Sequence, residues 1–176
     1  HNAFGKGTRV RVAAMLRAFK ARYLLDADVR NALVTLARNG FASASLDRVL
    51  YTLTLRSDAL LHDTVTELLL PAFERGRTEI DTATVLAWLR EQLADGRMEK
   101  PWGDETATSV AQHLLATLRD FGVLSGAVNK RITPPYLSTE AFAFVAMLRQ
   151  REVRSGDLLL HDPEWRIFFL PQLGVE

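Results

Sequence analysis

Hydrophobic and polar residues recur along most of the chain with the 3.6-residue period of an α-helix, and this pattern predicts seven helices. Leucine and alanine are frequent and β-branched runs are rare, which also favours helices over strands. We expect the helices at residues 8–25, 28–38, 46–56, 57–70, 82–93, 105–121 and 138–151, with a short helix after Asp162. Pro71 is expected to end the fourth helix, because proline breaks the helical hydrogen-bond ladder.

The first helix is expected to carry an apolar stripe and a basic stripe side by side. At about 100° per residue, five apolar side chains share an arc that we expect to be buried: Val12, Met15, Leu16, Phe19 and Tyr23. Four basic side chains share the adjacent arc: Lys6, Arg9, Arg17 and Lys20. A helix of this kind docks on a core through one stripe and contacts phosphates through the other.

The segment from Trp102 to Ser138 has the order of a winged helix-turn-helix: a helix, a glycine stop, a basic hairpin and a proline-marked turn. Residues 82–93 would be the supporting helix and residues 105–121 the recognition helix, placed in the major groove. The outward side of the recognition helix carries Thr108, Ser109 and Gln112, and the tip of the hairpin at residues 123–134 carries Asn129, Lys130 and Arg131. Two other interpretations stay open: the hairpin tip is only solvated, and Asp104 and Glu105, which oppose phosphate, only cap the helix.

The polar stretch FERGRTE at residues 73–79 contains Gly76 and predicts a boundary between two lobes. We therefore expect a mainly α protein with two domains. Residues 1–76 would form a helical, helix-turn-helix-like lobe with a basic first helix. Residues 77–176 would form a winged-helix-like lobe with a small β-hairpin.

Composition and charge narrow the class of protein. At 176 residues and 48% hydrophobic the chain buries a substantial core, and without cysteine it has neither disulfides nor a thiolate metal site. The longest uncharged apolar run, Ala141 to Leu148, is far shorter than a bilayer span of about 20 residues. Residues 1–39 hold eight basic and two acidic residues, a net +6, so the rest carries −5 of the total +1. This asymmetry suits a polyanion, or equally a solvated face beside acidic neighbours.

The sequence offers no catalytic constellation. His62, His113 and His161 are far apart, and only His62 stands next to a carboxylate, at Asp63. General base catalysis or metal ligation needs residues that converge. We therefore expect no enzyme activity, no metal, no cofactor and no small-molecule substrate.

Two stretches and the basic helix resemble the BrxA family, the A component of the BREX bacteriophage-resistance systems. The stretches are LRDFGVLSGAVNKRITPPYLSTEAFAFV (118–145) and EWRIFFLPQLGVE (164–176), and the basic helix is GKGTRVRVAAMLRAFKARY (5–23). The resemblance implies a cytoplasmic, mostly helical accessory protein that binds double-stranded DNA without catalysis and lies beside other BREX proteins. It also implies that this chain lacks segments at both ends.

The pattern and the resemblance together predict a phage-defence protein that binds duplex DNA with little sequence preference. The expected DNA-binding residues are Lys6, Arg9, Arg11, Arg17, Lys20, Thr108, Ser109, Gln112, Lys130 and Arg131, with Arg149, Arg151 and Arg154 widening the second patch. The alternative is a helical adaptor that holds a partner protein, which exposure of Phe41, Leu55 or Phe144 would favour. A third interpretation, a hydrolase, requires a histidine to meet carboxylates in a cleft.

Overall fold

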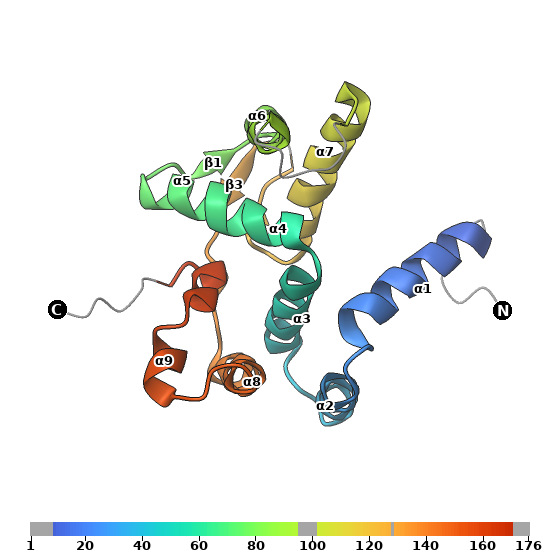
Figure 1. Ribbon diagram of the computed structural model, residues 1–176, viewed down its shortest axis with the longest axis vertical. Helices are drawn as coiled ribbons and strands as arrows, with labels where there is room; N and C mark the ends of the chain where they lie inside the picture. Colours follow the sequence, from blue (N-terminus) through green and yellow to red (C-terminus); the bar gives the residue numbers. More distant parts are fainter. Residues whose placement is uncertain (1–8, 95–101, 128, 171–176) are drawn as a thin grey trace. The chain divides into compact units, whose positions relative to one another are not determined.

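The computed structural model describes residues 9–94, 102–127 and 129–170, and these are mainly helical with a small antiparallel sheet (Figure 1). The predicted fold class, a mainly α protein with a small hairpin, is confirmed. The chain divides into two compact units, His1–Asp58 and Ala59–Glu176. The sequence pattern placed the lobe boundary at Gly76 instead. The FERGRTE stretch leads into a short strand at Glu79–Ile80, and the lobe boundary at this stretch stays a prediction.

Unit 1 consists of three helices, α1 (Arg9–Tyr23), α2 (Ala27–Arg38) and α3 (Ser43–Ser57). Asp26 caps α2 by accepting the backbone N–H groups of Asp28 and Val29. Helix α3 is the most buried of the three, since the five consecutive residues 51–55 are all buried. Helix α1 packs against α3, and the hydroxyl groups of Tyr23 and Thr54 lie 2.7 Å apart.

The predicted burial of the apolar stripe on α1 is wrong. No residue of this helix is buried, and Met15, Leu16 and Phe19 are each about half exposed. Of the five residues of the stripe, Val12 and Tyr23 are half-buried, and Tyr23 contacts α3 through Thr54. The period of a stripe shows which face of a helix is apolar, but it does not supply a neighbour wide enough to cover that face.

Unit 2 begins with a long helix that continues through Pro71. It consists of α4 (Ala59–Asp63), a π-helical stretch η1 (Thr64–Leu69) and α5 (Leu70–Glu74). The predicted stop at Pro71 is therefore wrong. In the π-helical stretch the N–H of Leu70 donates to the carbonyl of Val65, five residues back, and this wider turn accommodates a ring that would clash in an α-helix. The helix ends at Gly76, whose φ of +78° is a common helix terminus.

The remaining elements of unit 2 include a three-stranded antiparallel sheet. They are β1 (Glu79–Ile80), α6 (Thr82–Ala94), α7 (Asp104–Asp120), β2 (Leu124–Ser125), β3 (Lys130–Ile132), α8 (Thr139–Gln150), α9 (Gly156–Leu160) and the 3₁₀ helix η2 (Pro163–Phe168). The strand order is β1-β3-β2, so the predicted hairpin gains a third strand from before α6. Helices α6 and α7 pack against each other, and α7 contacts β2. The sheet buries Ile80, Leu124 and Ile132.

Candidate nucleic-acid interface

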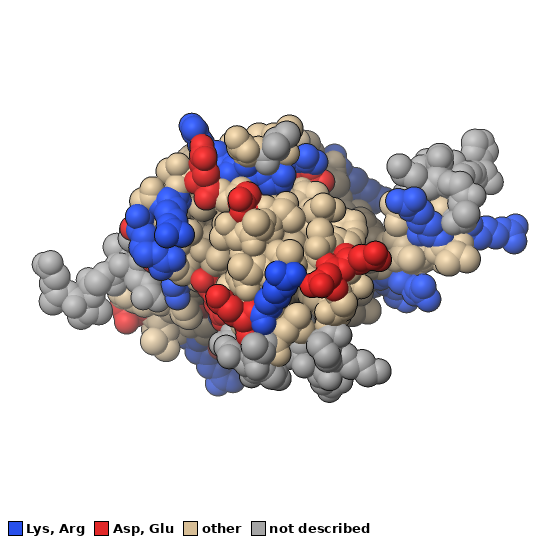
Figure 2. All heavy atoms as spheres, turned by 90° about the horizontal axis from the view of Figure 1, so that it is seen from above, with Lys and Arg blue, Asp and Glu red and all other residues tan. Residues whose placement is uncertain are grey.

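Helix α1 presents basic side chains to solvent without an acidic residue among them. Arg9, Arg11, Arg17 and Lys20 are all exposed, and α1 contains neither Asp nor Glu. Within the described ranges, no carboxylate pairs with Arg9, Arg17 or Lys20, whereas Arg22 meets Asp58 at 3.3 Å. Figure 2 shows blue side chains with no red ones between them on the part of the surface that α1 forms. Lys6 lies outside the described residues.

Helix α7 turns part of its predicted polar side outward. Its buried stripe consists of Ala107, Ala111, Leu114, Leu115 and Leu118. Ser109 and Gln112 are exposed, while Thr108 is half-buried and its hydroxyl donates to the carbonyl of Asp104 at 2.8 Å. Of the three predicted contact residues on α7, Ser109 and Gln112 are therefore the ones exposed to a ligand.

The start of α7 differs from the predicted cap. Gly103, not Asp104, is the N-cap residue, and it makes no side-chain cap bond. The carboxylate of Asp104 instead accepts a hydrogen bond from Arg90 of α6 at 2.8 Å. This ion pair ties the two helices together at the surface and neutralises both charges.

Lys130 and Arg131 lie on β3, the central strand of the sheet, between β1 and β2. Lys130 donates from Nζ to the carbonyl of Ala127 at 3.0 Å, and Arg131 lies opposite Glu79 of β1, with 3.9 Å between their charged groups. The turn depends on Gly126, because its φ is +89° and a Cβ there would lie 2.3 Å from the carbonyl oxygen of Asn129. The predicted hairpin is thus present, and Lys130 and Arg131 are each engaged by another group of the protein.

Three arginines around α7 and the hairpin have acidic partners, unlike Arg9, Arg17 and Lys20 of α1. Arg90 pairs with Asp104, Arg119 with Asp120 at 3.1 Å, and Arg131 with Glu79. In the face shown in Figure 2, away from α1, blue and red side chains lie next to one another. The two predicted patches therefore differ in kind: α1 is a purely basic surface, and the surface of α7 and the hairpin is mixed.

Arg149 was expected to widen the second patch, and this expectation is wrong. Its guanidinium is only 16% exposed, meets the buried Asp162 at 2.8 Å and also bonds to Glu152. Burial acts to lower the pKa of Arg149, but the hydrogen bond and charge of Asp162 outweigh it and raise this pKa above its usual value. Arg149 is a packing residue of unit 2 because its charge is already compensated. Arg151 and Arg154 are exposed.

The fold brings His62 between two carboxylates, which the sequence alone did not show. Nδ1 lies 3.4 Å from Asp63, and Nε2 lies 4.0 Å from Glu164 of η2. The carboxylates approach opposite edges of the ring, so they cannot ligate one ion together with it. His113 is exposed, and His161 bonds to the carbonyl of Asp157. The geometry of His62 is that of a bridge between α4 and η2.

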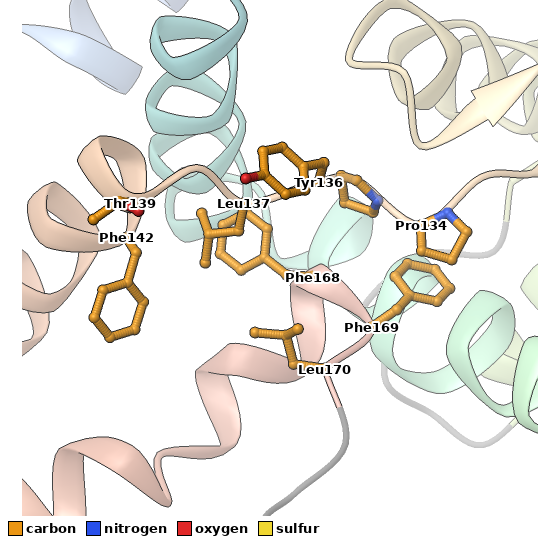
Figure 3. A pocket seen from close by; sticks show the side chains of 9 residues that line it. Pro134, Tyr136, Leu137, Thr139, Phe142, Phe168, Phe169 and Leu170 are labelled. Atoms are coloured by element: carbon orange, nitrogen blue, oxygen red, sulfur yellow. The ribbon is translucent and has the colours of Figure 1, made fainter.

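An aromatic pocket of about 540 Å³ lies between the segment before α8 and the end of η2 (Figure 3). Its floor is the buried Phe168, and no charged residue lines it. Phe142 stacks on Trp165 at its rim, with ring centroids 4.9 Å apart. Phe169 contacts Phe73 and has a φ of +59°, which is unusual for a bulky residue.

These features define a mainly helical protein with a basic helix in one unit and a helix-and-hairpin surface in the other. Residues 1–149 match the family described as BrxA, so the chain belongs to the BrxA family and is a component of a BREX phage-defence system. No curated protein and no solved structure matches the chain. None of the helices in the described parts of the chain is long and apolar enough to cross a membrane.

Proposed function

We propose that this BREX component is a cytoplasmic, non-catalytic protein that binds the backbone of double-stranded DNA with little sequence preference. The observation that carries the proposal is that three exposed cations of α1, Arg9, Arg17 and Lys20, have no carboxylate partner among the described residues. Cations that already have a carboxylate must break an ion pair before they bind phosphate, whereas Arg9, Arg17 and Lys20 need not. They are therefore the best sites for the counterion release that dominates non-specific DNA affinity.

The order of elements in unit 2 supports a second contact with the duplex. The long helix α4–α5, β1, α6, α7 and the hairpin β2–β3, with strand order β1-β3-β2, follow one another as in a winged helix. In that arrangement α7 enters the major groove and the hairpin lies along the backbone. Ser109 and Gln112 would face the groove, and Lys130 and Arg131 would face phosphates.

The mixed charge of this second surface suits positioning more than affinity. Asp104 and Glu105 stand in the first turn of α7, where a phosphate would otherwise bind the helix N-terminus. A duplex that approaches α7 must therefore do so away from that first turn. Most of the electrostatic free energy of binding is assigned to α1, and orientation to α7 and the hairpin.

The experiment is fluorescence anisotropy with a random-sequence duplex between 50 and 200 mM salt. We expect micromolar or tighter binding at low salt, with an affinity that falls steeply as salt rises. Lys130→Ala with Arg131→Ala should weaken binding without changing the fold, and Arg75→Ala with Arg77→Ala, exposed beyond the end of α5, is a matched control of equal charge. An unchanged affinity in the first double variant removes the hairpin from the proposal, and no binding at the lowest salt overturns it.

The adaptor alternative is not favoured by the residues that the sequence suggested for it. Leu55 is buried, and Phe41 and Phe144 are half-buried. Other BREX proteins remain the partners that we propose for this chain, because the family belongs to a multi-protein system.

A further inference from the structure

Helix α1 leaves a row of large apolar side chains in solvent next to its cations. Met15 is 44% exposed, Leu16 49% and Phe19 51%. The phosphate contacts of the proposed DNA binding involve the cations and leave this row uncovered. Exposed apolar residues that lie together typically mark a contact with another molecule.

The spacing of the row matches that of a helix–helix contact. Val12, Met15, Leu16 and Phe19 follow the i, i+3, i+4, i+7 pattern through which one helix packs on another. Val12 is half-buried, and Phe19 packs edge-on against Tyr23 with 5.0 Å between ring centroids. Met15 and Leu16 lie about 100° apart around the helix axis, so the exposed side chains span the width of the stripe, on both sides of Val12 and Tyr23.

The cations beside the row indicate which kind of partner surface can cover it. Arg9, Leu16 and Lys20 fall within about 40° of one another around the helix axis. A partner side chain that covers Leu16 must therefore lie next to two cations that have no carboxylate among the described residues. We propose that an amphipathic helix of a partner protein, with acidic residues along the edge of its apolar stripe, docks on Met15, Leu16 and Phe19.

The same charges argue against two other occupants. In a two-fold dimer through α1, the same surface of each copy would face the other. Because each α1 holds five basic residues and no acidic one, ten basic residues would then lie together without a carboxylate. A membrane-bound helix inserts its whole apolar face into the lipid. Here the hydroxyl of Tyr23, on that face, is bonded to Thr54 of α3.

Docking of this helix and binding of DNA share two cations but not the apolar row. Arg9 and Lys20 serve both, so an acidic helix would displace the duplex from α1. Leu16 and Phe19 serve only the docked helix, and this difference separates failure of the present inference from failure of the proposed DNA binding.

The test is fluorescence anisotropy of a fluorescein-labelled synthetic helix of about three heptads, titrated with the full chain. The helix carries leucine at the a and d positions and glutamate at e and g. The glutamates repel one another and keep the helix from pairing with itself. We expect binding that Leu16→Ser with Phe19→Ser weakens at least about tenfold, with duplex affinity unchanged. Lys20→Glu should weaken both interactions. The matched control is Val10→Ser, which is 77% exposed and lies on the other side of α1, and it should change neither. Circular dichroism checks that each variant keeps its helices.

Four results would overturn the inference. The first is that the glutamate helix does not bind at 100 µM, about the upper end for a specific contact. The second is that a helix with lysine at e and g binds as tightly as the glutamate helix. The others are a dimer of the chain in sedimentation that Leu16→Ser with Phe19→Ser abolishes, and tighter binding to phosphatidylglycerol vesicles than to the helix. The last two identify a second copy or a membrane as the occupant instead.

Discussion

Replacement of Asp162 should destabilise unit 2 more than replacement of an exposed acidic residue beside it. Its carboxylate is 2% exposed, meets Arg149 Nε at 2.8 Å, and accepts the backbone N–H of Glu164 at 2.9 Å through its second oxygen. Asp162 thus compensates a largely buried guanidinium and caps η2 at the same time. Each role has its own energetic cost when it is lost, so the two are separable by substitution.

Asp162→Asn keeps the oxygen that caps η2 but removes the charge beside Arg149. Breaking a buried pair by removing one partner costs about 3–5 kcal/mol. We expect about 3 kcal/mol, since Glu152 still bonds to Arg149. Asp162→Ala also removes the cap and should cost about 1 kcal/mol more. Glu152→Gln, at the 49% exposed partner of the same arginine, should cost about 1 kcal/mol or less.

Urea unfolding followed by tryptophan fluorescence measures these differences, because Trp88, Trp102 and Trp165 all belong to unit 2. The combination of Arg149→Met with Asp162→Leu should recover most of the lost stability, since it removes both charges together. A loss below about 1 kcal/mol for Asp162→Asn would refute the reasoning, because so small a value is typical of an exposed pair. An equal loss for Glu152→Gln would refute it too.

Three further changes have expected outcomes. Gly126→Ala should destabilise the protein in thermal unfolding by about 1–3 kcal/mol, whereas Gly76→Ala, with a similar φ but open space around it, should cost about 1 kcal/mol. Tyr23→Phe should cost about 1 kcal/mol by removing the hydroxyl contact with Thr54, as measured by hydrogen exchange in α3. Asp81→Ala should cost about 1 kcal/mol at neutral pH. Hydrogen bonds from the hydroxyl and N–H of Thr84 lower the pKa of Asp81, so this difference should be constant above about pH 4 and vanish as the pH falls through the lowered pKa.

The sequence predicted most helices because their periods and caps are local. Asp26 and Ser138 cap α2 and α8 through bonds to residues two or three positions away. Strand β1 was missed because two residues carry no period, and its partner β3 is about fifty positions further along. The passage of the helix through Pro71 was missed because the π-helical turn that permits it has no sequence signal that we recognised.

The candidate site was predictable in its residues but not in its electrostatics. The basic residues of α1 are visible in the sequence, and the helical period places them on the surface. Their distinction from the arginines of unit 2 depends on pairs such as Arg90 with Asp104 and Arg131 with Glu79, whose partners are distant in sequence. The burial of Arg149 against Asp162 likewise depends on the path of the chain after α8.

In the proposed function, Arg9, Arg17 and Lys20 of α1 supply most of the affinity for duplex DNA. The most direct test is the salt dependence of duplex binding for the wild-type chain and for Arg9→Gln, Arg17→Gln and Lys20→Gln combined. Each lost phosphate contact lowers the slope of log affinity against log salt by about 0.9, so the slope should become shallower by about 3. An unchanged slope, with unchanged affinity at 50 mM salt, would contradict the account.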